Sequence, residues 1–311
     1  MNLALASVVA ALIQVGGEPL RPGLMQGSAV VPLERAAGGD TPVLSFRTAA
    51  GPGDGAVVRL LVDTGASSTL VTAALVRRLG VASTPIPPAQ FGLAGAGEDC
   101  GELGPRRAVL PVLQLAGEGG RVEVRGGEVL VLEADGLPPG VDGVIGAPLL
   151  RQLPLWVDPG ANRLALGARA LQAGERLAAA DPVAPAALTL RWRAGVPLVP
   201  LTTPAGPVSA LADTGAEGLF ITPALAGRLP ATAPPTPVGI LGFCGLQPAQ
   251  RLSLTGISFS GRAPRGPLEA IVTANPVFAA VGAEAIVGQE LLRHHRQLWR
   301  LDREPPTLQL W

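Results

Sequence analysis

Two short stretches decide how this chain folds: LLVDTGA at residues 60–66 and ALADTGA at residues 210–216. In each stretch, apolar residues typical of a buried strand lead directly into Asp-Thr-Gly. A single Asp-Thr-Gly is most often a turn, because Asp can bond its own backbone and Gly tolerates a positive φ. Two copies with similar flanks indicate instead that a structural unit occurs twice.

The similarity extends on both sides of these stretches. Upstream, VLSFR at 43–47 and LTLRW at 188–192 show the alternation that predicts strands. Downstream, Thr72 and Thr222 each precede a segment of helical composition, and Thr is a good N-cap. Both copies are therefore expected to contain a strand, the Asp-Thr-Gly turn and a short helix in the same order.

A third pair of matching segments sets the extent of each copy. DGVIGAPLLR at 142–151 corresponds to EAIVGQELLR at 284–293, and each copy then runs to a Trp, an Asp and a strand-like end. We therefore predict a first repeat over 41–166 and a second repeat over 186–311. The Ala-rich residues between them, 167–185, are predicted to be a linker.

The residues before the first repeat allow two interpretations. The apolar run over 3–13 is too short to span a bilayer, and it is similar to the hydrophobic region of a signal peptide. This interpretation predicts a signal peptide over 1–17, a leader or N-terminal strand over 18–40, and a periplasmic or secreted protein. The alternative is that the run forms the first β-strand of the folded protein, which would then be cytoplasmic.

The composition excludes several classes of function. The 311 residues include 24 basic and 24 acidic side chains, and this zero net charge argues against nucleic acid as a partner. Hydrophobic residues make up 48% and charged residues 15%, so a folded core is expected rather than disorder. No later apolar run is long enough for an integral membrane span. With two Cys and two adjacent His, no metal site and no cofactor is expected.

The paired aspartates indicate a specific chemistry. Asp63 and Asp213 each stand at the end of a predicted strand, in a turn that the nearby Gly permits. A pseudo-twofold axis between the repeats would bring the two carboxylates face to face, and such a pair shares one proton. One carboxylate could then activate a water as general base, while the protonated one hydrogen-bonds the carbonyl under attack.

The two Asp-Thr-Gly-Ala loops resemble the active-site loops of aspartic proteases, and the Ala after Gly is closer to the retropepsin-like, bacterial-type branch. Ile145-Gly146 and Val287-Gly288 are similar to the second signature of that family, two apolar residues followed by Gly. The resemblance covers both repeats. It implies an all-β, bilobal pepsin/retropepsin-like fold, with two pseudo-twofold-related β-lobes and short helices in one chain.

This resemblance also implies an activity. The chain would be an aspartic-type endopeptidase, a hydrolase that acts as a monomer on a peptide or protein substrate. The alternative is a non-catalytic peptide-binding protein on the same fold.

Site residues follow from the same resemblance. Asp63 and Asp213 would be the catalytic dyad. The residues that would support the dyad structurally are Thr64, Thr214, Gly65 and Gly215. The residues that would bind substrate, in loops and flaps, are Ala66, Ala216, Glu217, Gly95, Gly97, Gly242 and Phe243. For Glu217 the alternative is a solvated turn residue.

Two Gly-rich segments are similar to the β-hairpin flaps that cover the dyad in this family. They lie at 91–97 and 238–243, at a comparable distance after each Asp. Pepsins carry a flap Tyr, whereas this chain contains no Tyr. Cys100 follows the first segment and Cys244 adjoins the second. A twofold arrangement of flaps would allow a disulfide between these two residues, and the alternative is two separate thiols.

Overall fold

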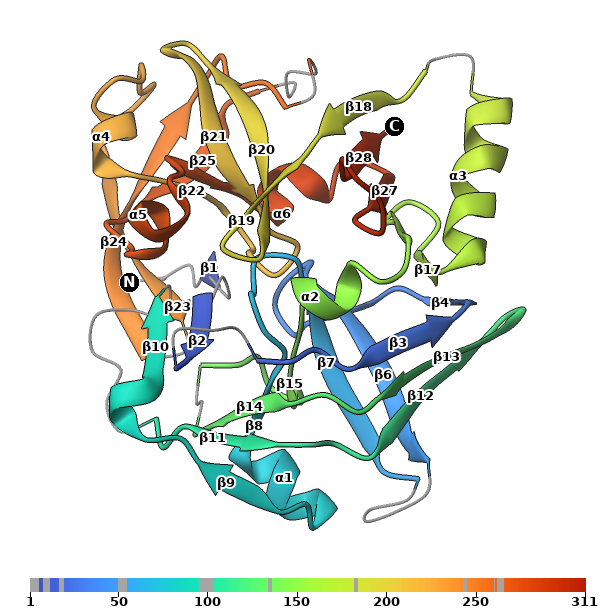
Figure 1. The fold of residues 1–311 in the computed structure, drawn as a ribbon. Coiled ribbons are helices and arrows are strands. Elements are labelled where there is room, and N and C mark those ends of the chain that lie inside the picture. Colours follow the sequence, from blue (N-terminus) through green and yellow to red (C-terminus); the bar gives the residue numbers. More distant parts are fainter. Residues whose placement is uncertain are drawn as a thin grey trace.

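Strands are the main secondary structure of this protein, a computed structural model in which two large β-sheets are joined by a third sheet (Figure 1). The structure describes residues 6–7, 12–16, 20–49, 55–94, 103–133, 136–181, 184–242, 245–259, 261 and 266–311. The all-β class predicted from the sequence is confirmed.

The first large sheet contains eleven strands of the described chain. In spatial order they are β3 (Leu24–Gly27), β13 (Gly120–Arg125), β12 (Val112–Gly117), β6 (Pro42–Ala49), β7 (Val57–Asp63), β15 (Gly143–Gly146), β8 (Leu70–Thr72), β14 (Val129–Leu132), β11 (Arg106–Ala108) and β9 (Ser83–Pro85), with β5 (Glu34–Arg35) paired to β6. This sheet is the centre of what is called here the first half.

The second large sheet contains nine strands of the described chain and is the centre of the second half. In spatial order they are β1 (Ala6–Ser7), β23 (Thr236–Gly242), β24 (Gly245–Leu254), β25 (Leu268–Val272), β22 (Leu219–Ile221), β26 (Ala285–Val287), β21 (Gly206–Ala212), β20 (Val196–Thr203) and β19 (Arg191–Arg193).

The same order of neighbours surrounds the Asp-Thr-Gly motif in both sheets. In the first sheet, β7 is parallel to β15, β15 is antiparallel to β8, and β8 is parallel to β14. The second sheet shows the same pattern: β21 is parallel to β26, β26 is antiparallel to β22, and β22 is parallel to β25. Gly146 lies opposite Asp63, and Val287 lies opposite Ala212. Each motif thus stands where a strand ends beside the apolar-Gly segment of its own half.

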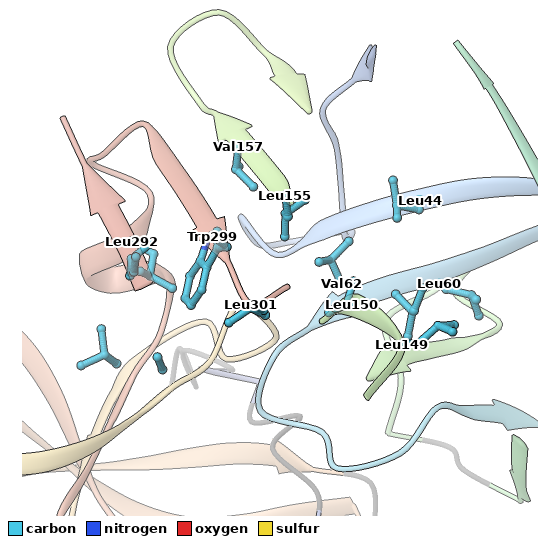
Figure 2. Packing of buried hydrophobic residues seen from close by; sticks show 14 of the residues in the cluster. Leu44, Leu60, Val62, Leu149, Leu150, Leu155, Val157, Leu292, Trp299 and Leu301 are labelled. Carbon is cyan, nitrogen blue, oxygen red and sulfur yellow. The ribbon is translucent and has the colours of Figure 1, made fainter. Parts of the chain in front are cut away.

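A six-stranded sheet joins the two halves in the described chain. Its strands are, in order, β18 (Ala186–Thr189), β28 (Thr307–Leu310), β27 (Gln297–Arg300), β16 (Leu155–Asp158), β17 (Arg163–Leu166) and β4 (Ala29–Pro32). Leu155 of β16 lies opposite Trp299 of β27, so strands from the two halves pair directly. Buried apolar side chains continue through this junction. Figure 2 shows part of that cluster, with the fully buried Trp299 on one side and Leu44 and Leu60 on the other.

The described helices are short, apart from one. They are α1 (Ala73–Leu79), α2 (Ala147–Leu150), α3 (Ala168–Ala180), α4 (Pro223–Ala226), α5 (Val277–Val281) and α6 (Gln289–Leu292). Both predicted caps are confirmed: the Thr72 hydroxyl accepts a hydrogen bond from the Leu75 N–H, and the Thr222 hydroxyl accepts one from the Leu225 N–H. Gly80 ends α1 with a φ of 63°, a conformation that favours Gly.

The predicted linker over 167–185 contains the longest described helix, α3. Its run of Ala, Leu, Glu and Arg consists of strong helix formers. Ala170 and Gly174 are its buried residues. A Cβ atom at Gly174 would lie 2.8 Å from Cδ2 of Leu298, so the helix rests directly on the six-stranded sheet. The segment is therefore a packed element of the fold as well as a connection.

The N-terminal residues form two short strands. β1 is parallel to β23, and β2 (Leu12–Val15) is antiparallel to β10 (Phe91–Ala94). The signal peptide over 1–17 stays a prediction. None of the helices in the described ranges combines the length and apolar character that a bilayer span requires.

Candidate active site

The two motif aspartates lie at the contact between the halves. Asp63 ends β7 and Asp213 follows β21, and each residue has 0% of its surface exposed. A Cβ atom at Gly65 would lie 2.4 Å from Cγ of Asp213, and one at Gly215 would lie 2.5 Å from Cγ of Asp63. Each loop therefore places its Gly against the carboxyl group of the other loop, and no larger residue fits there.

Four hydrogen bonds tie the two loops together. The Thr64 N–H donates to Oγ1 of Thr214 at 3.1 Å, and the Thr214 N–H donates to Oγ1 of Thr64 at 3.0 Å. The Thr64 hydroxyl donates to the Ala212 carbonyl at 2.7 Å, and the Thr214 hydroxyl donates to the Val62 carbonyl at 2.6 Å. Because each hydroxyl both accepts and donates across the contact, the network fixes the position of both aspartates.

In each carboxyl group, one oxygen accepts a hydrogen bond from a backbone N–H and the other does not. Oδ1 of Asp63 accepts the Gly65 N–H and Oδ1 of Asp213 accepts the Gly215 N–H, both at 2.8 Å. No N–H or hydroxyl of the described residues bonds either Oδ2 atom, although both atoms are buried. These two oxygens are the polar atoms left for a bound reactant.

Burial and proximity change the acidity of the pair. Burial raises the pKa of Asp63 well above its ordinary value, and the charge of the neighbouring Asp213 raises it further. Burial also raises the pKa of Asp213, against the hydrogen bonds that this carboxyl group accepts. Two such groups in contact bind a first proton more readily than an isolated carboxylate does.

The apolar-Gly segments pack under the loops. A Cβ atom at Gly146 would lie 2.5 Å from the Ser68 carbonyl oxygen, and one at Gly288 would lie 2.3 Å from the Ala216 carbonyl oxygen. Ala66 and Ala216, predicted to bind substrate, are fully buried and belong to the apolar clusters of the two halves.

Gln289 is a site residue that the sequence reasoning missed. Its side chain is buried, and Nε2 donates to the Thr214 carbonyl at 2.7 Å. This hydrogen bond fixes the backbone of the second Asp-Thr-Gly loop. Ala147 stands at the corresponding position of the first repeat. That difference between otherwise matching segments was the only signal in the sequence.

Glu217 lies in a contact that differs from both sequence-based interpretations. It is half-buried, and its carboxylate accepts the Asp40 and Thr41 N–H groups, both at 2.8 Å, and also the Thr41 hydroxyl. The Glu217 carboxylate therefore binds the protein's own backbone rather than that of a substrate. The contact lies where residues 40–41, just before β6, meet the second half. Asp40 in turn forms an ion pair with Arg293 at 3.2 Å.

Ser67 occupies the corresponding position of the first repeat and was also missed. Its Oγ accepts the Ile13 N–H at 2.7 Å and donates to the Ile13 carbonyl at 3.3 Å. Ser67 and Glu217 are thus equivalent positions that each bind the backbone of a segment distant in sequence.

The structure covers the predicted flaps in part. Gly242 ends β23 and pairs with Gly245 of β24, so the second segment forms a β-hairpin arm. In the first segment, residues 91–94 form β10. Gly95, Gly97, Phe243, Cys100 and Cys244 lie outside the described residues, so the disulfide stays a prediction. Within the described ranges, no group of three or more His, Cys, Asp or Glu side chains could hold a metal ion.

The chain is similar to one protein-family model and to several solved structures. Residues 51–149 match a family model described as aspartyl protease. No curated protein matches the chain. Conglutin gamma, a basic 7S globulin from lupine seeds, shares the fold with a TM-score of 0.50 at 14% identity, over 91% of this chain and 94% of that one.

Two further solved structures are similar. Basic 7S globulin from soybean has a TM-score of 0.49 at 15% identity, over 91% of this chain and 94% of that one. Aspartic proteinase from Irpex lacteus has a TM-score of 0.47 at 13% identity, over 91% of this chain and 97% of that one.

Proposed function

We propose that this chain, which matches an aspartyl protease family model over residues 51–149, belongs to the aspartic protease superfamily and is an aspartic-type endopeptidase. Asp63 and Asp213 would form its catalytic dyad. The observation that carries the proposal is the reciprocal contact in which the Gly of each loop lies against the carboxyl group of the other.

The proposed reaction needs one proton on the pair. The ionised carboxylate takes a proton from a water held between the two Oδ2 atoms, and the water oxygen attacks the peptide carbonyl carbon. The protonated carboxyl group donates its proton to the carbonyl oxygen, which gives a tetrahedral gem-diol. When the C–N bond breaks, the carboxyl group that took the water proton gives it to the leaving nitrogen. A hydroxyl of the gem-diol passes its proton to the other carboxylate as the C=O bond re-forms, so the pair again holds one proton. The raised pKa values favour the singly protonated pair that this cycle requires.

The test is cleavage of a denatured protein mixture by full-length Asp63→Asn and Asp213→Asn variants. Each substitution keeps the shape of the side chain and removes its ability to ionise. We expect each variant to lose about 100- to 10,000-fold of the cleavage rate. Asp302→Asn, at an aspartate bonded to Arg300 on the six-stranded sheet, is the matched control and should cleave normally.

Unchanged cleavage in both dyad variants would end the catalytic proposal. If the wild-type chain binds peptides and cleaves none of them, the chain is the non-catalytic peptide-binding protein that the sequence left open.

We also propose that the enzyme acts as a monomer. Both aspartates, and the four hydrogen bonds between their loops, come from one chain. Light scattering during size-exclusion chromatography should therefore give the mass of one chain for the active fraction. Activity confined to a dimer peak would contradict this.

A further inference from the structure

A cavity of about 590 Å³ lies between α3 and the six-stranded sheet. Figure 1 shows α3 at the right-hand edge of the molecule, whereas β21, which precedes Asp213, lies to the left of centre. None of the described residues that line this cavity belongs to an Asp-Thr-Gly loop. Sites for small molecules have volumes of about 300–1,000 Å³. The cavity is therefore large enough for a small ligand, and it is separate from the candidate active site.

One side of α3 forms the first wall of the cavity. Arg169, Ala173, Arg176 and Ala180 line it, and they follow one another at spacings of four, three and four residues. Residues at these spacings lie on one side of a helix. The neighbouring side of α3 carries the buried Ala170 and packs on the sheet. The helix thus rests on the sheet along one side and borders the cavity along the next.

Two neighbouring strands of the sheet form the second wall. Trp156 of β16 lies opposite Ala165 of β17, and Asp158 lies opposite Arg163. Opposite residues of an antiparallel pair share a face of the sheet, as do residues two apart in one strand, so these side chains stand on the face that α3 covers in part. Trp156 is 4% exposed, and its ring packs edge-on against Trp311 with the centroids 5.3 Å apart. The sheet therefore supplies an apolar floor with a charged pair beside it.

Four arginines line the cavity in the described chain, and acidic side chains neutralise two of them. Arg163 forms an ion pair with Glu118 at 2.5 Å, and Arg296 forms one with Asp158 at 3.3 Å. These two acids are the negatively charged residues among the described residues of the lining. Both pairs leave the cavity without net charge.

The other two arginines have no acidic partner. The Arg169 guanidinium donates to Oε1 of Gln172 at 3.0 Å and contacts the Gly119 carbonyl oxygen at 3.5 Å, and both acceptors are neutral. Arg176 lies on the same side of α3, and it forms no hydrogen bond or ion pair within the part of the chain that the structure describes. The described lining therefore has an excess of two positive charges beside an apolar floor.

This combination of charge and apolar surface complements one class of small molecule. A phosphate monoester carries a charge of about −1.5 to −2 at pH 7, which balances two arginines. The planar guanidinium group matches phosphate oxygens with two parallel hydrogen bonds. The organic part of such an ester can cover the floor formed by Trp156 and Ala165, because aromatic and apolar side chains line most small-molecule sites.

We propose that the cavity is a binding site for a small organic phosphate monoester with an apolar or aromatic body. Arg169 and Arg176 bind the phosphate group, and the floor of the cavity binds the body. The inference does not depend on the proposed function, since neither aspartate of the dyad takes part.

The experiment is isothermal titration calorimetry of the full chain with phenyl phosphate. Low ionic strength is used because salt screens the charges of partly exposed arginines. Three further probes separate the parts of the ligand. Phenol lacks the phosphate group, inorganic phosphate lacks the ring, and benzoate carries a single charge.

Arg176→Ala is the variant that tests the site. The residue is exposed and Ala is a strong helix former, so the fold should be retained. Arg77→Ala, at an exposed position of α1 outside the cavity, removes the same charge and is the matched control. The thermal unfolding midpoint of each variant without ligand verifies folding.

We expect phenyl phosphate to bind the wild-type chain, and Arg176→Ala to weaken this binding about tenfold to hundredfold, because hydrogen bonds to a charged group are lost. Arg77→Ala should bind phenyl phosphate as the wild type does. Phenol should bind at least about tenfold more weakly because it lacks the charged group, and so should inorganic phosphate because it buries no apolar surface. Benzoate should also bind more weakly than phenyl phosphate.

Absence of phenyl phosphate binding, or equal affinity of Arg176→Ala and Arg77→Ala for it, would overturn the proposal. Phenol or inorganic phosphate bound as tightly as phenyl phosphate would overturn the assignment of the charged head or of the apolar body. Benzoate bound as tightly would contradict a site for a phosphate monoester.

Discussion

Gly65 and Gly215 are the residues through which each half contacts the Asp carboxyl group of the other half. Each has the carboxyl group of the opposite Asp at the place where a Cβ atom would be. The Gly of the motif is therefore needed for contact with the other loop as well as for its own turn.

Gly65→Ala should separate the two carboxyl groups. The added Cβ atom would lie 2.4 Å from Cγ of Asp213, which forces the loops apart. Because a displacement of about 1 Å can cost about 100-fold in rate, we expect a loss of kcat/KM of that order. Gly266→Ala is the control, since a Cβ atom there meets no other atom within 4 Å. Equal activity of the two variants would contradict the close contact.

The raised pKa values give the stability of the protein a defined pH dependence. A carboxyl group whose pKa is raised in the folded state contributes stability below its unfolded value, and that stability is lost as the pH rises through the folded value. In the Asp63→Asn variant, the side chain at position 63 is neutral at every pH. We therefore expect the melting temperature of the wild-type chain to fall relative to that of Asp63→Asn as the pH rises above about 4. If the difference in melting temperature between the two proteins is the same at all pH values, burial does not disfavour the charged form of Asp63.

At the scale of single residues, the sequence predicted the residues within each Asp-Thr-Gly motif. It did not predict the hydrogen bonds that segments distant in sequence form with the residues after the motif. The dyad candidates followed from two similar stretches and the chemistry of paired carboxylates. The partners of Ser67 and Glu217 are Ile13 and residues 40–41, which no local pattern connects to them. A hydrogen bond between segments distant in sequence depends on the folded arrangement, so periodicity and composition carry no trace of it.

Among the elements, the segment before β6 and the loop after β21 form a direct connection between the halves. The carboxylate of Glu217 binds two consecutive backbone N–H groups and the Thr41 hydroxyl. These bonds hold the start of β6 against the second half, next to the loops of the dyad.

Glu217→Ala should therefore destabilise the protein. Two backbone donors lose their partner, and an unsatisfied group of this kind costs about 1–3 kcal/mol of unfolding free energy. Urea denaturation is the measurement. Glu175→Ala, on an exposed position of α3, should change the unfolding free energy by less than about 0.5 kcal/mol. A Glu217→Ala variant as stable as Glu175→Ala would show that the connection contributes nothing.

Element prediction succeeded where a local signal was complete. Thr72 and Thr222 are found at the starts of helices, as predicted, because N-capping depends on neighbouring residues alone. The helix α3 was missed because its Ala-rich sequence suits a linker equally well. Its stability comes from packing of Ala170 and Gly174 on the six-stranded sheet, which only the assembled fold provides.

For the whole molecule, the essential feature is that each half supplies one Asp to a single site. The six-stranded sheet and the continuous apolar cluster hold the halves together, so the loops meet without a partner chain. If the two carboxyl groups share one proton, they act as one unit, and removal of the second should cost little after removal of the first.

The most direct test is therefore kcat/KM of full-length Asp63→Asn, Asp213→Asn and the double variant on one peptide substrate. The account predicts that each single substitution costs about 100-fold or more, and that the double variant is about as impaired as either single variant. Losses that multiply in the double variant, or one single variant with wild-type kcat/KM, would contradict a shared dyad.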